Sequence, residues 1–171
     1  MVEIHKKIQT QCCENIPSAK KDLYFVAVKI FLLDSNENLL IIKDCFNVWD
    51  IPGGRLREID FDTELKNVVE RKIKEELGTE VKYKLGNPVI FMRHERDEVL
   101  SSGGKEKRRI FAIGYIAQYQ GGDIILGKNH QKYEWVNIKT FHPENRFTGG
   151  WLKGVKDFQK YYNKSIIKNN K

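Results

Sequence analysis

The segment from Gly53 to Gly78 holds the residue types with the clearest capacity for chemistry. It opens with Gly53-Gly54-Arg55 and closes with Glu70-Arg71-Lys72-Ile73-Lys74-Glu75-Glu76-Leu77-Gly78. Carboxylate oxygens on a helix are hard ligands of the kind that Mg²⁺ takes, with waters and substrate phosphates in its other positions. A glycine pair lets the backbone approach a ligand closely. The segment therefore has residue types that can ligate a divalent cation.

Helical geometry gathers several of these charges on one face. Residues three and four apart are neighbours on a helix, so Arg71 and Lys72 lie beside Glu75 and Glu76. Glu70 falls on the opposite side from Glu75, where we expect it to be solvated. An ordinary solvated helix face is the alternative interpretation of Glu75-Glu76. The glycine turn upstream favours the site.

The elements that must position these residues are predicted from hydrophobic periodicity. A helix is expected over 64–77, ended by Gly78, and a second over Trp151–Tyr162. The polar segment Glu95–Lys107 is expected to be a loop. The order of strands, helix, strands and helix indicates an α+β fold with a mixed β-sheet. Apolar and β-branched runs predict strands at Leu23–Leu33, Leu39–Ile42, Val48–Ile51, Val81–Tyr83, Val89–His94, Arg108–Gln118 and Tyr133–Ile138.

Composition restricts the class of protein. The 171 residues are 40% hydrophobic and 31% charged, which is typical of one globular domain and excludes collagen and coiled coils. The longest apolar runs, such as Ile30–Leu33, are too short to span a membrane. No secretory signal is visible, so a cytoplasmic location and no membrane partner are expected. The net charge of +7 favours anionic partners, either phosphorylated small molecules or nucleic acid.

The Gly53–Thr79 segment resembles the signature of the Nudix hydrolase family. Flanking residues agree, since Trp49–Gly54 is similar to the family's entry strand and Tyr133–Val136 to its closing strand. The resemblance implies a Nudix-type α/β/α sandwich over residues 23–163, between an N-terminal arm or edge element (1–22) and a basic polar tail (164–171). The signature residues that match are Arg71, Ile73, Glu75, Glu76 and Gly78.

This resemblance also implies an activity and its residues. Family members hydrolyse a pyrophosphate bond in a nucleoside diphosphate linked to another moiety, such as a nucleotide or a sugar, with Mg²⁺ or Mn²⁺. The implied metal ligands are the Gly53 carbonyl, Glu75 and Glu76, and Arg71 would orient the two catalytic glutamates. The residues expected to contact substrate are Arg55, Lys72, Arg93 and Arg109.

The sequence departs from the family pattern, and two of the departures, at Lys72 and Asn129, keep an alternative open. Lys72 replaces a glutamate, and Asn129, followed by His130, stands where many members have an extra glutamate. An ammonium cannot ligate a cation, although it can contact a phosphate directly. The loop 57–63 is longer than in the family pattern. Either Asp60 or Glu64 can therefore correspond to the acidic residue that the pattern has in this loop.

The alternative function is a catalytically weakened Nudix-type module that binds a nucleotide or an RNA end. Metal dependence separates the two functions, because a hydrolase needs the cation and a pure binding module does not. The expected partner is a phosphorylated small molecule, and the sequence leaves open both an RNA end and a homodimer.

Overall fold

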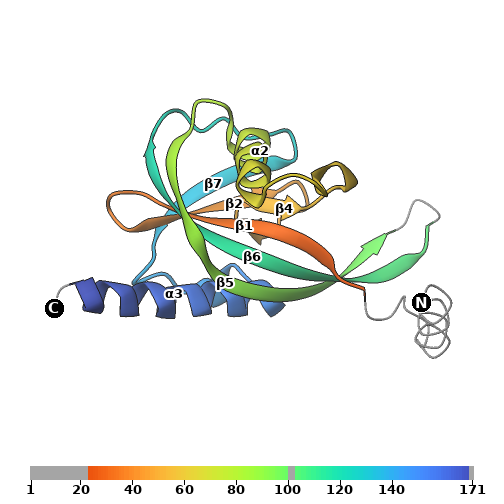
Figure 1. Ribbon diagram of the computed structural model, residues 1–171. Coiled ribbons are helices and arrows are strands. Elements are labelled where there is room, and N and C mark those ends of the chain that lie inside the picture. Colours follow the sequence, from red (N-terminus) through yellow and green to blue (C-terminus); the bar gives the residue numbers. More distant parts are fainter. Residues whose placement is uncertain (1–22, 100–102, 170–171) are drawn as a thin grey trace, which may run out of the picture.

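The computed structural model describes residues 23–99 and 103–169, with side chains through residue 165. A seven-stranded sheet lies between helix α2 (Leu65–Leu77) on one face and helix α3 (Gly149–Asn169) on the other (Figure 1). Two short 3₁₀ helices, η2 (Glu58–Asp60) and η3 (Pro143–Asn145), lie in the connections. The strands are β1 (Phe25–Leu33), β2 (Asn38–Asp44), β3 (Trp49–Asp50), β4 (Gly53–Arg55), β5 (Lys82–Val99), β6 (Lys105–Gly121) and β7 (His130–Asn137).

The sheet is mixed, as the sequence predicts. Its main order is β3-β2-β1-β6-β5, and β4 and β7 add to it by pairing with β1 and β2. Strand β1 runs parallel to β6 and antiparallel to β2 and β4. The β1–β4 pairing sets Gly53 opposite Lys29, which brings the glycine turn to the centre of the sheet. The expected α/β/α sandwich is confirmed.

The core has two layers because β1 is covered on both faces. Val28 and Ile30 pack with α2, whereas the side chains on the opposite face of β1 pack with α3. Phe31 is fully buried and stacks on Phe158 of α3 with ring centroids 4.0 Å apart. This two-sided burial explains the nearly continuous apolar sequence of β1.

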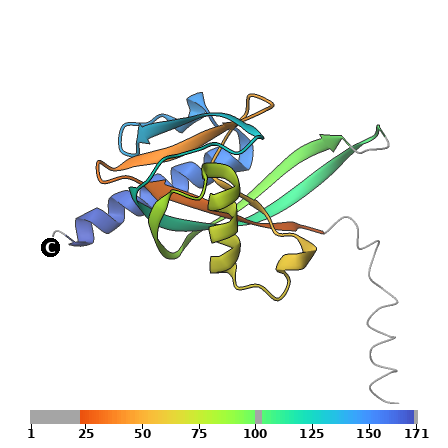
Figure 2. The ribbon, with the colours of Figure 1, turned by 90° about the horizontal axis from the view of Figure 1, so that it is seen from above.

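Two segments differ from the sequence-based expectation. Most of Glu95–Lys107, expected as a loop, is paired strand, since β5 and β6 continue to the pair Val99–Lys105. The resulting hairpin projects from the body of the domain (Figure 2). Its outer part is polar on both faces, so it has no apolar alternation that would predict a strand. Helix α3 continues through 169 and includes most of the expected tail, whereas the expected arm over 1–22 lies outside the described residues.

No helix in the described part of the chain has the length and apolar content needed to cross a membrane.

Replacement of Phe158 by alanine should test how α3 is anchored. We expect the variant to lose about 3–5 kcal/mol of the free energy of unfolding, because a buried ring is replaced by a cavity. Urea denaturation followed by circular dichroism measures the loss. The matched control is Tyr161→Ala on the same helix. The Tyr161 side chain is partly exposed, so its removal should lower the free energy of unfolding by less than about 1 kcal/mol. Equal losses in the two variants would contradict this account of the core.

Candidate active site

The centre of the site is a contact between the end of α2 and the turn that enters β4. The backbone N–H of Gly53 donates a hydrogen bond to Oε2 of Glu76 over 2.8 Å. Gly53 has φ +134°, and a Cβ there would lie 2.1 Å from the carbonyl oxygen of Val28. Only glycine therefore allows β4 to pair this closely with β1 while its N–H points at the carboxylate.

Burial changes the proton affinity of Glu76. Desolvation raises the pKa of this carboxyl to about 7, and the nearby Lys29 ammonium and the Gly53 hydrogen bond oppose the rise. A cation placed beside Glu76 would favour its ionised form for the same electrostatic reason. The carboxylate thus lies in an environment that gains from a positively charged ligand.

Lys29 is a buried cation beside the same turn. Its side chain is 4% exposed, and Nζ donates to Oδ2 of Asp50 over 2.6 Å and to the carbonyl oxygen of Ile51 over 3.0 Å. The ammonium also lies 4.8 Å from the centroid of the Trp151 ring. These partners offset the cost of removing the charge from water. Sequence reasoning missed Lys29, although a lysine inside an otherwise apolar strand was the available signal.

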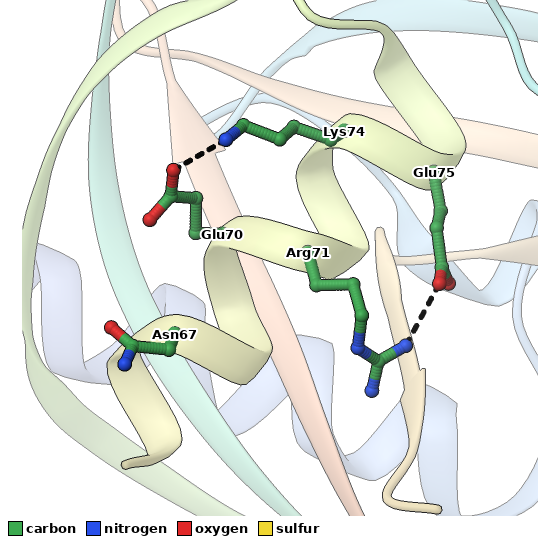
Figure 3. A pocket seen from close by; sticks show the side chains of 5 residues that line it. All are labelled: Asn67, Glu70, Arg71, Lys74 and Glu75. Atoms are coloured by element: carbon green, nitrogen blue, oxygen red, sulfur yellow. Dashed lines mark hydrogen bonds and ion pairs between the residues drawn. The ribbon is translucent and has the colours of Figure 1, made fainter. Parts of the chain in front are cut away.

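Glu75 is surrounded by cations. Arg71 Nη1 lies 2.9 Å and Arg57 Nη2 3.2 Å from its Oε1, and Lys72 Nζ lies 3.2 Å from its Oε2. Although partial burial opposes the change, Arg71 and Lys72 lower the pKa of Glu75. Figure 3 shows the Arg71–Glu75 pair on one side of α2, with Glu70 on the other side and paired to Lys74. The charges therefore gather at one end of the helix face, as the helical spacing predicts.

The structure decides which acid of the longer loop contacts the site. Asp60 is 4% exposed, and its Oδ2 accepts the backbone N–H of Arg57 over 2.7 Å and lies 2.5 Å from Arg71 Nη2. The Arg57 hydrogen bond is the largest cause that lowers the pKa of Asp60. Glu64 instead forms an exposed pair with Lys66. Asp60 thus positions Arg71, which in turn contacts Glu75.

Two adjoining cavities surround these groups. Glu76, Asn129 and His130 line both of them. The larger, about 480 Å³, is called the main cleft, and the smaller, about 350 Å³, is called the side cavity. The main cleft is also lined by Ala27, Lys29, Ile42, Asp44, Cys45, Phe46, Asp50, Gly53, Gly54, Arg55, Arg96, Ile110 and Trp151. The side cavity is also lined by Arg57, Lys72, Glu75, Gly127 and Lys128.

His130 adds a titratable group at the junction of the two cavities. Burial lowers the pKa of its imidazole, so the ring is neutral at neutral pH. Its Nδ1 is buried and has no hydrogen-bond partner among the described residues. His130 directly follows Asn129, and the family spacing that pointed to Asn129 was the signal for this position.

The side cavity has a donor set that fits a divalent cation. Both Glu75 and Glu76 line it, and its volume leaves space for waters and a phosphate. Mg²⁺ is commonly bound through one or two carboxylates, with waters and substrate phosphates completing its octahedron. No cluster of three or more His, Cys, Asp or Glu side chains suited to a metal occurs in residues 23–99 and 103–169.

The residues expected to contact substrate divide into two groups. Arg55 lines the main cleft and Lys72 the side cavity. Arg93 and Arg109 line neither, and Arg109 pairs with Glu95 over 3.1 Å. Successive residues of a strand point to opposite faces of the sheet. Because His94 stacks on Trp151, the neighbouring Arg93 points to the other face and away from these cavities.

A family model described as the NUDIX domain matches residues 23–153, which is most of the chain. The chain therefore belongs to the NUDIX domain family, and the resemblance to Nudix hydrolases is confirmed. No curated protein sequence matches the chain.

Solved structures share the fold at low identity. A MutT protein from Methanosarcina mazei Go1 has 20% identity and a TM-score of 0.65, and the match covers 81% of this chain and 95% of that one. An ADP-ribose pyrophosphatase from Streptococcus suis has 12% identity, a TM-score of 0.55 and coverage of 82% and 92%. The E. coli dihydroneopterin triphosphate pyrophosphohydrolase has 12% identity, a TM-score of 0.54 and coverage of 81% and 99%. At these identities the likeness establishes the fold.

Asp60→Asn should test how Arg71 is held. We expect a loss of about 2 kcal/mol of unfolding free energy at pH 7, because a charged hydrogen-bond acceptor is removed from a buried position. The folded-state pKa of Asp60 is lowered, so its stabilisation is present above the unfolded value near 3.8 and disappears as pH falls through the folded value. Urea titrations at several pH values measure the difference.

The control for this variant is Glu64→Gln, the other acid of the loop. Its exposed pair with Lys66 should contribute little to the free energy of unfolding, because solvent screens the two charges. A pH-independent loss in Asp60→Asn would mean that packing, rather than charge, holds the loop.

Proposed function

We propose that this protein hydrolyses a pyrophosphate bond in a nucleoside diphosphate linked to a second moiety, and that it requires Mg²⁺ or Mn²⁺. The observation that carries the proposal is the junction of the main cleft and the side cavity at Glu76, Asn129 and His130. A substrate with its nucleoside part in the main cleft would have its diphosphate beside both glutamates. Membership of the NUDIX domain family supports the same reaction.

Glu75 and Glu76 would hold the divalent cation in the side cavity. When bound, such an ion neutralises charge that develops on a phosphate and lowers the pKa of a coordinated water. Contacts within the protein orient the two glutamates. Gly53 fixes Glu76 through its N–H, and Arg71, held by Asp60, fixes Glu75.

The remaining residues of the two cavities have separate tasks in this proposal. Lys72 donates from its ammonium to a phosphate oxygen, because its Nζ faces the side cavity beside Glu75. The neutral imidazole of His130 accepts a proton from the attacking water. Arg55 and Arg96 in the main cleft contact the anionic backbone of the substrate.

Glu76→Gln is the direct test of this function. We expect metal-dependent turnover to fall by at least about 100-fold, equivalent to about 2.7 kcal/mol of transition-state stabilisation, because an anionic ligand becomes neutral. The measurement is phosphate release after a coupled phosphatase, with nucleotide sugars, ADP-ribose, nucleoside triphosphates and dinucleoside polyphosphates, in Mg²⁺, in Mn²⁺ and in chelator. The matched control is Glu70→Gln on the outer face of α2, which should retain activity. Full turnover in Glu76→Gln would refute its role.

A second candidate function is a Nudix-type module that binds a nucleotide or an RNA end without hydrolysing it. It is favoured by the Lys72 ammonium beside Glu75, since a resident cation there opposes a second one.

Lys72→Glu separates the two functions. In a hydrolase that uses Lys72 on a phosphate, we expect the substitution to lower kcat/KM by about tenfold or more, with tighter Mn²⁺ binding in titration calorimetry. In a binding module, the same substitution should create metal-dependent turnover where the unmodified protein has none. Lys72→Gln is the control, because it removes the ammonium without adding a ligand.

A further inference from the structure

The hairpin of β5 and β6 carries two exposed phenylalanine rings that contact each other. Phe91 of β5 is 65% exposed and Phe111 of β6 is 36% exposed, and their ring centroids lie 6.1 Å apart at an interplanar angle of 18°. Val26 of β1 is also exposed and is the register partner of Phe111. Exposed apolar side chains that cluster inside a polar rim are typical of interaction sites.

The two rings lie on the side of the sheet that α2 covers elsewhere. Phe91 is the register partner of Ile113, and Phe111 is two residues from Ile113, so the three side chains point to one face. Ile113 packs in the core layer under α2. The hairpin then extends past the helix, and Figure 2 shows this side of it uncovered by any helix of the described residues. The rings therefore lie where the sheet leaves the body of the domain.

A guanidinium group lies directly across from one of the rings. Arg93 is the register partner of Phe111 and is two residues from Phe91, so it shares their face. Its side chain is exposed and forms no ion pair within residues 23–99 and 103–169. A guanidinium group can donate to a phosphate and can also stack on a planar ring. Arg93 thus adds a cation beside two aromatic surfaces.

Basic residues continue along the same face toward the tip of the hairpin. Arg109, Lys107 and Lys105 occupy alternate positions of β6, so their side chains point to the side on which Phe111 lies. Lys107 and Arg109 share one carboxylate, that of Glu95, over 3.1 Å each. Their hydrogen bonds lower the pKa of Glu95. One carboxylate thus serves two cations.

The charges on this face do not balance. Four cations stand against two carboxylates, those of Glu95 and Asp97. Like Arg93, Lys105 forms no ion pair among the residues that the structure describes. The surface has a positive potential that favours an anionic partner. We call it the hairpin face, and its defining residues are Phe91, Arg93, Lys105, Lys107, Arg109 and Phe111.

The combination of rings and cations suits a single-stranded nucleic acid. Proteins bind single strands with aromatic side chains on which bases stack and with cations that follow the phosphates. Rings presented on adjacent strands of an open sheet are one known form of this recognition. The centre of an interface between two proteins is, in contrast, depleted in charged residues.

We propose that the hairpin face binds a single-stranded oligonucleotide, with a base stacked on Phe91 and with phosphates contacting Arg93 and the cations of β6. Phe91, Arg93 and Phe111 line neither the main cleft nor the side cavity. The proposal therefore goes beyond the proposed hydrolysis and does not depend on it. RNA and DNA share this chemistry, and the test distinguishes them.

Fluorescence anisotropy of the full chain with a labelled RNA of about ten nucleotides tests the stacking. The RNA has a 5′-hydroxyl end and the buffer contains chelator, so binding is measured apart from pyrophosphate hydrolysis. We expect Phe91→Ala to raise the Kd by about tenfold or more, and Phe91→Trp to retain binding. The matched control is Phe61→Ala, which removes an exposed ring from the loop 57–63 and should change the Kd by less than about twofold. Circular dichroism checks that each variant is folded.

A strand without bases separates stacking from charge. On an abasic DNA strand of equal length, Phe91→Ala should have little effect, whereas Arg93→Gln should weaken the binding of both strands by about threefold or more. Lys84→Gln is the control for charge, because it removes an exposed lysine from the other end of β5. Equal binding of a DNA with bases would assign the face to either kind of single strand, and weaker binding would assign it to RNA.

The absence of RNA and DNA binding would overturn the proposal, as would equal losses in Phe91→Ala and Phe61→Ala. Analytical ultracentrifugation tests the other occupant, a second copy of this chain. A dimer that Phe91→Ala dissociates, in a protein that binds no oligonucleotide, would assign the rings to self-association and overturn the proposal.

Discussion

The hydrogen bond from the Gly53 N–H to the Glu76 carboxylate is the contact on which the site depends. It joins the end of α2 to the strand that pairs with β1, so the helix and the sheet are positioned by the same interaction. The close approach of Gly53 to Val28 excludes any side chain at this point. In the proposed hydrolase, a carboxylate so fixed would need no reorganisation when a cation binds, which is the condition under which electrostatic catalysis is effective.

Around this contact, the protein balances buried charges of both signs. Lys29 pairs with Asp50 beneath the turn, and Asp60 pairs with Arg71 at the loop. Each pair removes the cost of an isolated buried charge and also fixes a neighbour of the glutamates. The two glutamates differ in their partners, because Glu75 contacts three cations whereas Glu76 accepts the backbone N–H of Gly53. The site is therefore asymmetric in charge.

Much of the fold was predictable because its signals are local. The continuous apolar run of β1, the spacing of α2 and its end at Gly78 each depend on residues near in sequence, and the structure has all three. The outer half of the β5–β6 hairpin was not predictable, because pairing rather than burial holds Glu95–Val99 in a strand. Periodicity reports burial, and a strand exposed on both faces has none.

For the site, the sequence by itself determined the Gly53–Gly78 segment and the side of α2 on which Glu75, Glu76 and Lys72 lie, because one helix defines those relations. Only the tertiary structure shows that Asp60, rather than Glu64, contacts Arg71, and that His130 and Lys29 both line the main cleft. These outcomes depend on strand register and on contacts between residues far apart in the chain, which no local pattern encodes.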